Sequence, residues 1–109
     1  MLYIRGIAFF QLKKYDEAIA DFNKIIENLE ANKVVFDNYI FLIRGGVLWK
    51  QKKYLEAIAD YTKAIEKNKA PELMWVAYFL RGIAFGELKK HEDMIADFAK
   101  AQELKKSAK

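Results

Sequence analysis

The sequence predicts an all-α protein built from three copies of one helix–turn–helix unit. One residue pattern occurs three times without internal gaps, over residues 5–22, 44–61 and 81–98. Within each copy, apolar residues recur at steps of three and four, as on one face of an amphipathic helix. The 109 residues include only one proline and five glycines, which is poor material for the many turns of a β protein. Together these observations favour a stack of helical hairpins.

Composition indicates a folded domain rather than a disordered chain. The sequence is 53% hydrophobic and 31% charged. Its 19 Lys and Arg exceed its 15 Asp and Glu, but this net charge of +4 is interspersed along the chain and forms no dense basic block. We therefore expect no nucleic-acid partner.

Cysteine is absent, which excludes disulfides and thiolate metal sites. The N-terminus shows no secretory signal, and no apolar stretch approaches the roughly 20 residues of a membrane helix. We expect no membrane partner and a cytoplasmic location.

Six helices are predicted in three units that form a single domain over residues 1–109. The first unit covers about residues 1–33, with helices at 2–12 and 15–30. The second covers about 34–70, with helices at 34–51 and 54–67. The third covers about 71–109, with helices at 71–88 and 91–106. The second helix of the first unit shows the helical spacing most clearly, through Ala18, Ile19, Phe22, Ile25 and Ile26.

The turn within each unit is predicted at a pair of lysines, Lys13-Lys14, Lys52-Lys53 and Lys89-Lys90. These turns lack the usual glycine. Carboxylates follow each turn, where negative charge suits the positive end of a new helix. Between the second and third units, Pro71 fits the first turn of a helix, because a missing N–H costs little there. The lysine turns are expected to be solvated, although a basic ridge is an alternative.

These residues resemble the tetratricopeptide repeat family. In that family a small residue lets the first helix pack close to the second, as Gly6, Gly45 and Gly82 would here. The family's small residue early in the second helix matches Ala18 and Ala57, and its aromatic four residues later matches Phe22, Tyr61 and Phe98. The resemblance covers nearly the whole chain and implies a right-handed α-solenoid. The spacings of 39 and 37 residues exceed the usual period of about 34, the closing proline is missing, and Met94 replaces the early alanine of the third unit.

The resemblance further implies that the first helix of each unit lines a concave, partner-binding face. The residues expected on it are Tyr3, Ile7, Phe10, Tyr39, Leu42, Trp49, Lys50, Val76, Phe79, Ile83 and Glu87, together with Gln11, Gly46 and Gly86. Some family members clamp a peptide's terminal carboxylate from the central row of this face. Here Ile7, Gly46 and Ile83 occupy that row, so the clamp is expected to be absent. A groove for an apolar or amphipathic helix, a face buried by longer helices, and self-association all remain open.

The same charge pair recurs across each predicted turn. An arginine precedes an aspartate by 16 residues three times, in the pairs Arg5 and Asp21, Arg44 and Asp60, and Arg81 and Asp97. We expect structural ion pairs, because each arginine has a matched carboxylate. A row of arginines for an acidic ligand is the alternative.

The residues that carry chemistry are few, and we expect no enzyme, no metal and no cofactor. His91 is the only histidine, and Ser107, the only serine, lies in the basic tail. A Ser–His–acid triad or a zinc site is therefore implausible. His91 stands where the other units have Tyr15 and Tyr54, so we expect it to be a packing residue.

The predicted function is that of an interaction module that binds a protein or peptide through an apolar groove. Leu2 aligns with Phe41 and Tyr78, which have more helix before them, so the N-terminal end of the stack is expected to look truncated. A truncated end beside an apolar groove makes a homodimer a reasonable hypothesis. The alternative is a structural repeat scaffold, natural or engineered, that has no ligand.

Overall fold

The computed structural model describes residues 2–31, 39–67 and 71–107, and all regular structure in these ranges is α-helical. The helices are α1 (Leu2–Gln11), α2 (Tyr15–Ala31), α3 (Tyr39–Lys50), α4 (Tyr54–Lys67), α5 (Pro71–Glu87) and α6 (His91–Ser107). The all-α, six-helix prediction is confirmed. The part of the third predicted helix that covers residues 34–38 lies outside the described residues. No helix in the described ranges is both long and apolar enough to cross a membrane.

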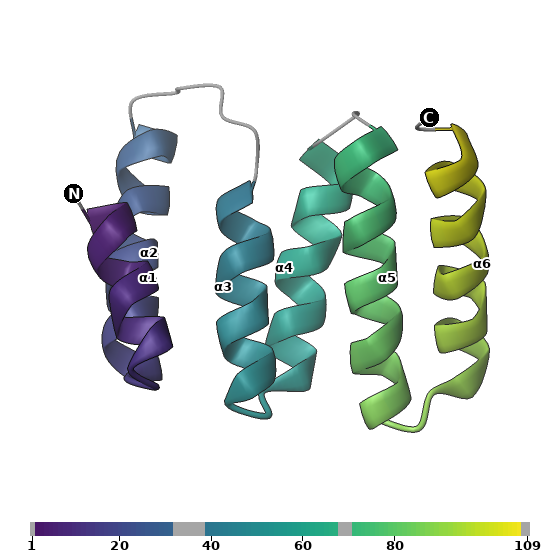
Figure 1. The fold of residues 1–109 in the computed structure, drawn as a ribbon, viewed down its shortest axis with the longest axis horizontal. Coiled ribbons are helices and arrows are strands. Elements are labelled where there is room, and N and C mark those ends of the chain that lie inside the picture. Colours follow the sequence, from purple (N-terminus) through teal and green to yellow (C-terminus); the bar gives the residue numbers. More distant parts are fainter. Residues whose placement is uncertain (1, 32–38, 68–70, 108–109) are drawn as a thin grey trace.

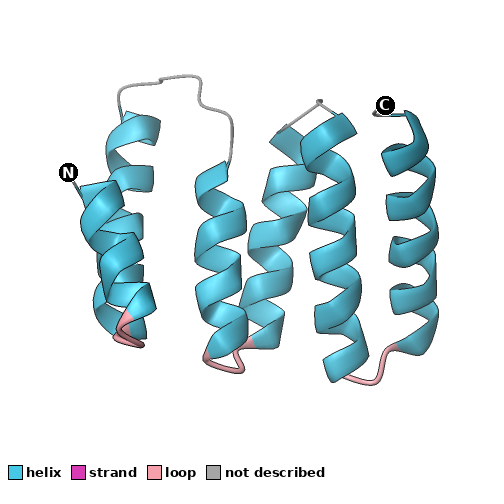
Figure 2. Cartoon of the chain, viewed as in Figure 1, coloured by secondary structure: helices cyan, strands magenta, loops and turns pink. Residues whose placement is uncertain are grey.

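The helices form three antiparallel hairpins that stand side by side in chain order (Figures 1 and 2). Within a hairpin, α1 packs on α2, α3 on α4 and α5 on α6. Between hairpins, α2 packs on α3 and α4 on α5. The first and third hairpins therefore lie at opposite ends of the array, with the second hairpin between them. This arrangement is a helical repeat solenoid.

Each hairpin closes where a glycine of its first helix meets an aromatic ring of its second. A methyl group built on Gly45 would lie 2.6 Å from Cε1 of Tyr61. The equivalent distances are 2.7 Å from Gly6 to Phe22 and 2.7 Å from Gly82 to Phe98. Side chains do not tolerate approaches this close, so only glycine allows the two helices to pack at this separation. The repeated glycines therefore allow the two helices to pack closely and do not form the turns.

The turns within the hairpins end their first helices with a lysine in the left-handed conformation. The φ angle is 62° at Lys13, 64° at Lys52 and 62° at Lys89. At the second turn, the Lys53 amide donates to the Leu48 carbonyl at 2.9 Å and the Lys52 amide donates to the Trp49 carbonyl at 2.9 Å. This pair of bonds is a Schellman motif, which satisfies the last carbonyls of a helix. The backbone pattern normally favours glycine, which explains why the lysine pairs alone gave a weak turn signal.

Paired charges also fasten each hairpin. Arg44 makes a bidentate contact with Asp60, with Nη2 2.7 Å from Oδ1 and Nε 2.8 Å from Oδ2. The same guanidinium donates from Nη1 to Oδ1 of Asn23 in the preceding hairpin at 2.8 Å. Arg81 repeats this arrangement with Asp97 and, at 3.2 Å, with the Thr62 hydroxyl. These arginines therefore join their own hairpin to the one before it.

Candidate functional site

A cavity of about 300 Å³ lies where α1, α3, α4 and α5 meet. We call it the central cavity, and its lining residues are Phe10, Gly46, Trp49, Lys50, Tyr61, Leu80 and Ile83. Gly46 contributes to the space, because no atom lies within 4 Å of a methyl group built on it. The glycine next to it meets the Tyr61 ring instead. Two adjacent glycines of α3 thus do different things, one closing the hairpin and the other opening the cavity.

The structure brings together residues from all three helices that were expected to line the partner-binding face. Phe10 of α1, Trp49 and Lys50 of α3 and Ile83 of α5 share the central cavity. Two of its residues, Tyr61 and Leu80, were not predicted from the sequence. Tyr61 is the repeated aromatic of the second unit, but it lies on a second helix, whereas the partner-binding face was expected from the first helices alone. Leu80 carries no signal of its own in the sequence.

Other residues expected on this face lie elsewhere. Leu42 is only 7% exposed and belongs to the core, so its expected contact with a partner is wrong. Val76 and Ile7 are half-buried and pack against the core. Tyr39 and Glu87 are exposed outside the central cavity. Phe79 lines a different cavity between α5 and α6, and the side chain of Tyr3 lies outside the described residues.

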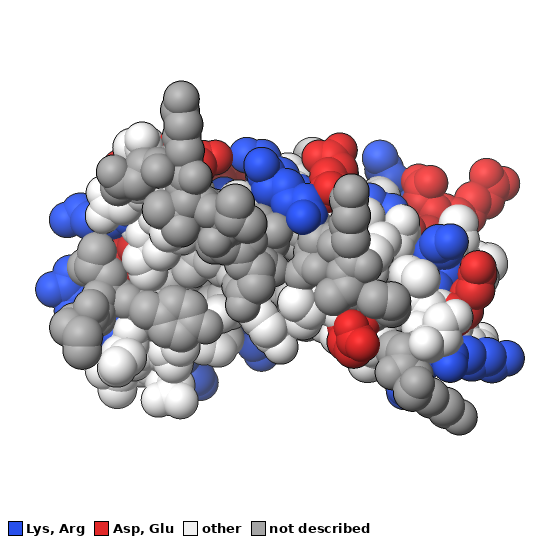
Figure 3. Space-filling model, turned by 90° about the horizontal axis from the view of Figure 1, so that it is seen from above, with Lys and Arg blue, Asp and Glu red and all other residues white. Residues whose placement is uncertain are grey.

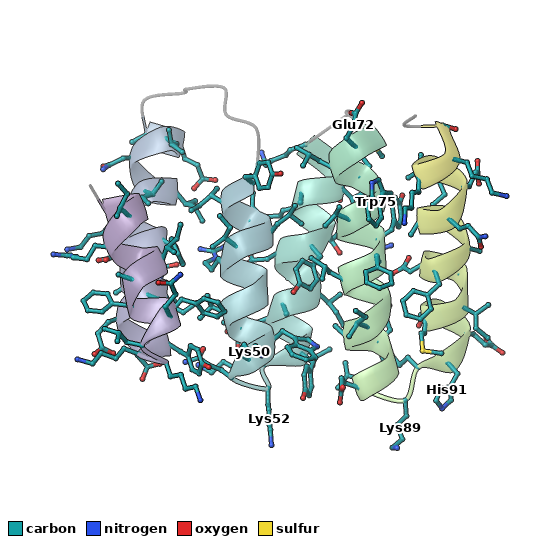
Figure 4. All side chains as sticks on the ribbon, in the orientation of Figure 1. Lys50, Lys52, Glu72, Trp75, Lys89 and His91 are labelled. Carbon is teal, nitrogen blue, oxygen red and sulfur yellow. The ribbon has the colours of Figure 1, made fainter. Side chains whose placement is uncertain are left out.

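The central cavity is apolar, with one cation at its rim. Lys50 is exposed, and its Nζ lies 5.6 Å from the centroid of the Trp49 ring, within the range of a cation–π contact. Figure 4 shows Lys50 near the last turn of α3. Within the described part of the chain, Nε1 of Trp49 is shielded from solvent and has no hydrogen-bond acceptor. Buried indole N–H groups usually have an acceptor, so the unpaired Nε1 of Trp49 is an exception within the described part of the chain.

Tyr61 forms the back of the cavity and is 2% exposed. Burial raises the pKa of its phenol to about 12, with a smaller contribution from the neighbouring Asp60 carboxylate. The hydroxyl therefore remains protonated at neutral pH. Tyr61 therefore adds no charge to the lining of the central cavity.

The three ion pairs differ in how well they are covered. The Arg44 and Arg81 side chains are each 19% exposed, whereas Arg5 is 57% exposed, although each aspartate is almost fully buried. Hydrogen bonding from Arg5 lowers the pKa of Asp21 below its ordinary value of 3.8 and outweighs the opposing effect of burial. All three arginines are thus engaged with carboxylates, which argues against a row of free arginines for an acidic ligand.

The remaining charged groups form no concentrated site. Lys52 and Lys89 project from neighbouring turns at one end of the hairpins (Figure 4). In Figure 3, acidic and basic side chains lie mixed along the upper edge and the right-hand end of the face. His91 is exposed, in contrast to half-buried Tyr15 and Tyr54, so its expected packing role is wrong. Across residues 2–31, 39–67 and 71–107, no cluster of three potential ligands could hold a metal ion.

A stack of helical hairpins with a cavity across its first helices defines a class of protein-interaction repeats. Family profiles described as tetratricopeptide repeat match residues 1–30 and residues 41–108. The chain belongs to the tetratricopeptide repeat family. Comparison with curated protein sequences gives no match.

One similar solved structure is titled "First TPR of Spaghetti (RPAP3) bound to HSP90 peptide SRMEEVD". It aligns with a TM-score of 0.78 and 28% sequence identity, and the alignment covers 94% of this chain and 75% of that one. That relative therefore binds a peptide on the same fold.

Proposed function

We propose that the central cavity binds a peptide or helix of a partner protein by taking up one large apolar side chain. The cavity itself supports this most directly. Aromatic and aliphatic groups line it, and its volume of about 300 Å³ lies at the lower end of the range for ligand pockets. Interfaces concentrate their binding energy in such anchor pockets. The partner is therefore a segment with an exposed aromatic or long aliphatic residue.

Two polar groups of the cavity, on Lys50 and Trp49, could contact the bound segment next to its apolar anchor residue. Lys50 at the rim favours a carboxylate close to the anchor residue. The unpartnered Nε1 of Trp49 favours a backbone carbonyl of the bound segment. Leaving a buried donor unpaired costs about 1–3 kcal/mol, so a segment that supplies a carbonyl would recover part of that free energy. We propose an acidic segment with an apolar anchor, bound without enzymatic chemistry.

The similar structure supports a peptide partner. The central cavity of this chain, however, is mostly apolar, so charge alone would not account for binding there. The peptide named in its title, SRMEEVD, contains one methionine among three carboxylate side chains. The central cavity offers only Lys50 as a lining cation. We therefore expect the apolar residue, rather than the carboxylates, to dominate binding here.

Fluorescence of Trp49 tests the proposal directly. Trp75 is the only other tryptophan and lines a different cavity, so Trp75→Phe leaves Trp49 as the sole reporter. The probes are labelled heptapeptides based on SRMEEVD, with methionine kept, enlarged to phenylalanine or cut to alanine. Binding should change Trp49 emission, and the alanine peptide should bind most weakly.

A cavity-filling variant supplies the decisive comparison. Gly46→Leu places a side chain in open space and should raise the dissociation constant at least about 30-fold, as expected for an anchor worth about 2 kcal/mol. Its stability should not fall. Leu55→Ala, at a position 66% exposed on α4, is the control and should bind like the parent. Binding that survives Gly46→Leu would refute the central cavity as the site. No response to any probe would favour a scaffold without a ligand.

A further inference from the structure

The first hairpin exposes an apolar stripe whose counterparts in the other hairpins are buried or half-buried. The α1 stripe consists of Ile4, Ala8 and Leu12, one turn apart, and Ile4 and Leu12 are 65% and 66% exposed. By the repeat spacing, its counterparts are Ile43, Val47 and Gln51 in the second unit and Leu80, Ala84 and Leu88 in the third. Val47 is 1% exposed and Ala84 0%, whereas Ala8 is exposed. The difference between these helices is that α3 and α5 each have a preceding hairpin to pack on.

The third hairpin leaves a matching apolar hollow at the opposite end of the array. A cavity of about 380 Å³ lies between α5 and α6, and we call it the C-terminal cavity. It is lined by Trp75, Phe79, Phe98, Ala101, Gln102 and Lys105. Phe79 packs against the rings of Trp75 and Phe98, with centroids 6.5 and 5.5 Å away, yet it remains 44% exposed.

In the second hairpin, the surface equivalent to the C-terminal cavity is covered by the next helix, α5. Leu42 and Tyr61 are the counterparts of Phe79 and Phe98, and they are 7% and 2% exposed. Helix α5 packs on this hairpin, and its Leu80 lines the central cavity together with Tyr61. Leu80 is also the counterpart of Ile4 in the α1 stripe. The interface between α4 and α5 is therefore a template in which the stripe of one unit covers the hollow of the unit before it.

We propose that a second copy of this chain docks its α1 stripe into the C-terminal cavity, and that the copies assemble head to tail. Helix α1 and the α5–α6 hairpin lie at opposite ends of the array (Figure 1), and Ile4, Leu12 and Phe79 on them are exposed. Ile4 of the incoming copy would share the C-terminal cavity with Phe98, as Leu80 and Tyr61 share the central cavity. This surface is separate from the central cavity, so the inference does not depend on peptide binding.

One polar contact of the template is missing at this joint. Arg44 and Arg81 reach back to Asn23 and Thr62, which each stand two residues after the paired aspartate. The counterpart in the third hairpin is Ala99, which has no acceptor side chain. Arg5 of the docked copy would therefore gain burial without this hydrogen bond. The joint should be weaker than the contacts inside the chain, and it should depend on concentration.

Head-to-tail contact differs from a symmetric dimer in a testable way. The two contacting surfaces are not the same, so each added copy offers a new open cavity and assembly does not stop at two. Light scattering on the 109-residue chain, from micromolar to millimolar concentration, should show an average mass that climbs past that of a dimer. Association through identical surfaces would level off at a dimer and would overturn the proposal, as would a monomer throughout.

Mixing two end variants tests the identity of the surfaces. Ile4→Glu disables the stripe and keeps the cavity, whereas Phe79→Glu disables the cavity and keeps the stripe. Each variant alone should be monomeric, and an equimolar mixture should form a complex of two chains and no larger species. Circular dichroism and thermal unfolding check that both variants fold. If Phe79→Glu does not fold, Gln102→Lys replaces it, because this cavity-lining side chain is exposed.

Matched controls and a gain of function complete the test. Leu55→Glu changes a leucine that is as exposed as Leu12 but lies at neither end, and it should associate like the parent. Ala99→Asn supplies the acceptor that Arg5 lacks and should tighten association about 3- to 10-fold, the effect of one added hydrogen bond. Association that is abolished by Gly46→Leu, or unaffected by both end variants, would show that the ends are not the contact.

Discussion

Gly45 and Gly46, adjacent in α3, allow the steric cost of close helix packing to be measured by comparing the same substitution at both positions. We expect Gly45→Ala to destabilise the protein and Gly46→Ala to stabilise it, although both add one methyl group to the same helix. The methyl group at Gly45 would meet Cε1 of Tyr61 at 2.6 Å, and Tyr61 is 2% exposed and cannot swing aside. The methyl group at Gly46 would meet nothing within 4 Å.

The magnitudes follow from two effects. Replacing glycine by alanine inside a helix gains about 0.8–1.0 kcal/mol at either position. Forcing an extra methyl group into a packed core costs about 1–3 kcal/mol, and only Gly45→Ala incurs this cost. Helix propensity therefore cancels between the two variants. The difference in their free energies of unfolding should be about 1–3 kcal/mol and should measure the steric conflict alone.

Urea unfolding of the parent and both variants is the assay. Equal slopes with respect to denaturant would show that the midpoints report stability rather than a change in the unfolded state. The parent should lie between the variants or close to Gly45→Ala. If Gly45→Ala were as stable as Gly46→Ala, the close approach of α3 and α4 would not be a packing constraint. The explanation given for all three repeated glycines would then be refuted.

Two further predictions concern a titrating group and a backbone conformation. The pKa of Tyr61 is about 12 in the folded protein, whereas that of an unfolded tyrosine is about 10. The unfolded chain therefore loses this proton at lower pH, and the stability of the fold should decline as pH rises from 10 toward 12. Tyr61→Phe should show a shallower decline in thermal unfolding over this range, and an equal decline would contradict the assigned burial. Lys52→Gly removes the strain of a left-handed lysine, which is about 1–2 kcal/mol. The added flexibility of glycine in the unfolded chain opposes this by about 0.4–1 kcal/mol. The free energy of unfolding should therefore rise by about 0.5–1 kcal/mol. A lower unfolding midpoint for Lys52→Gly would show that the lysine side chain contributes at this turn.

The repeat pattern made the helices and their pairing predictable, because each unit carries the same local signals. Ends of the second, fourth and sixth helices agree with the prediction to within one residue. The turns were also found where paired lysines break the apolar spacing. Their left-handed conformation was not foreseen, since lysine gives no indication of it.

The site was only partly predictable, because it depends on how neighbouring units cover one another. Trp49 and Lys50 were expected on the partner-binding face and line the central cavity. Leu42 was expected beside them, but it belongs to the core of the protein, whereas its counterpart Phe79 at the end of the array is exposed. The two positions are equivalent in the repeat, but the second hairpin has α5 packed on it, and no helix among the described residues packs on the third in the same way. Spacing within one unit carries no information about that difference.

Packing between consecutive helices has a consequence for how the chain folds. Among the described helices, extensive contacts join only those that follow each other in the sequence, so stabilising contacts form without the closing of a large loop. Folding can begin in any hairpin and extend to its neighbour, and low contact order favours rates in the microsecond to millisecond range. Among the described helices, α2 and α3 form the least extensive of these interfaces, so the first hairpin is the least firmly joined to the rest. The first hairpin should therefore open first and exchange its amide hydrogens sooner than the other two.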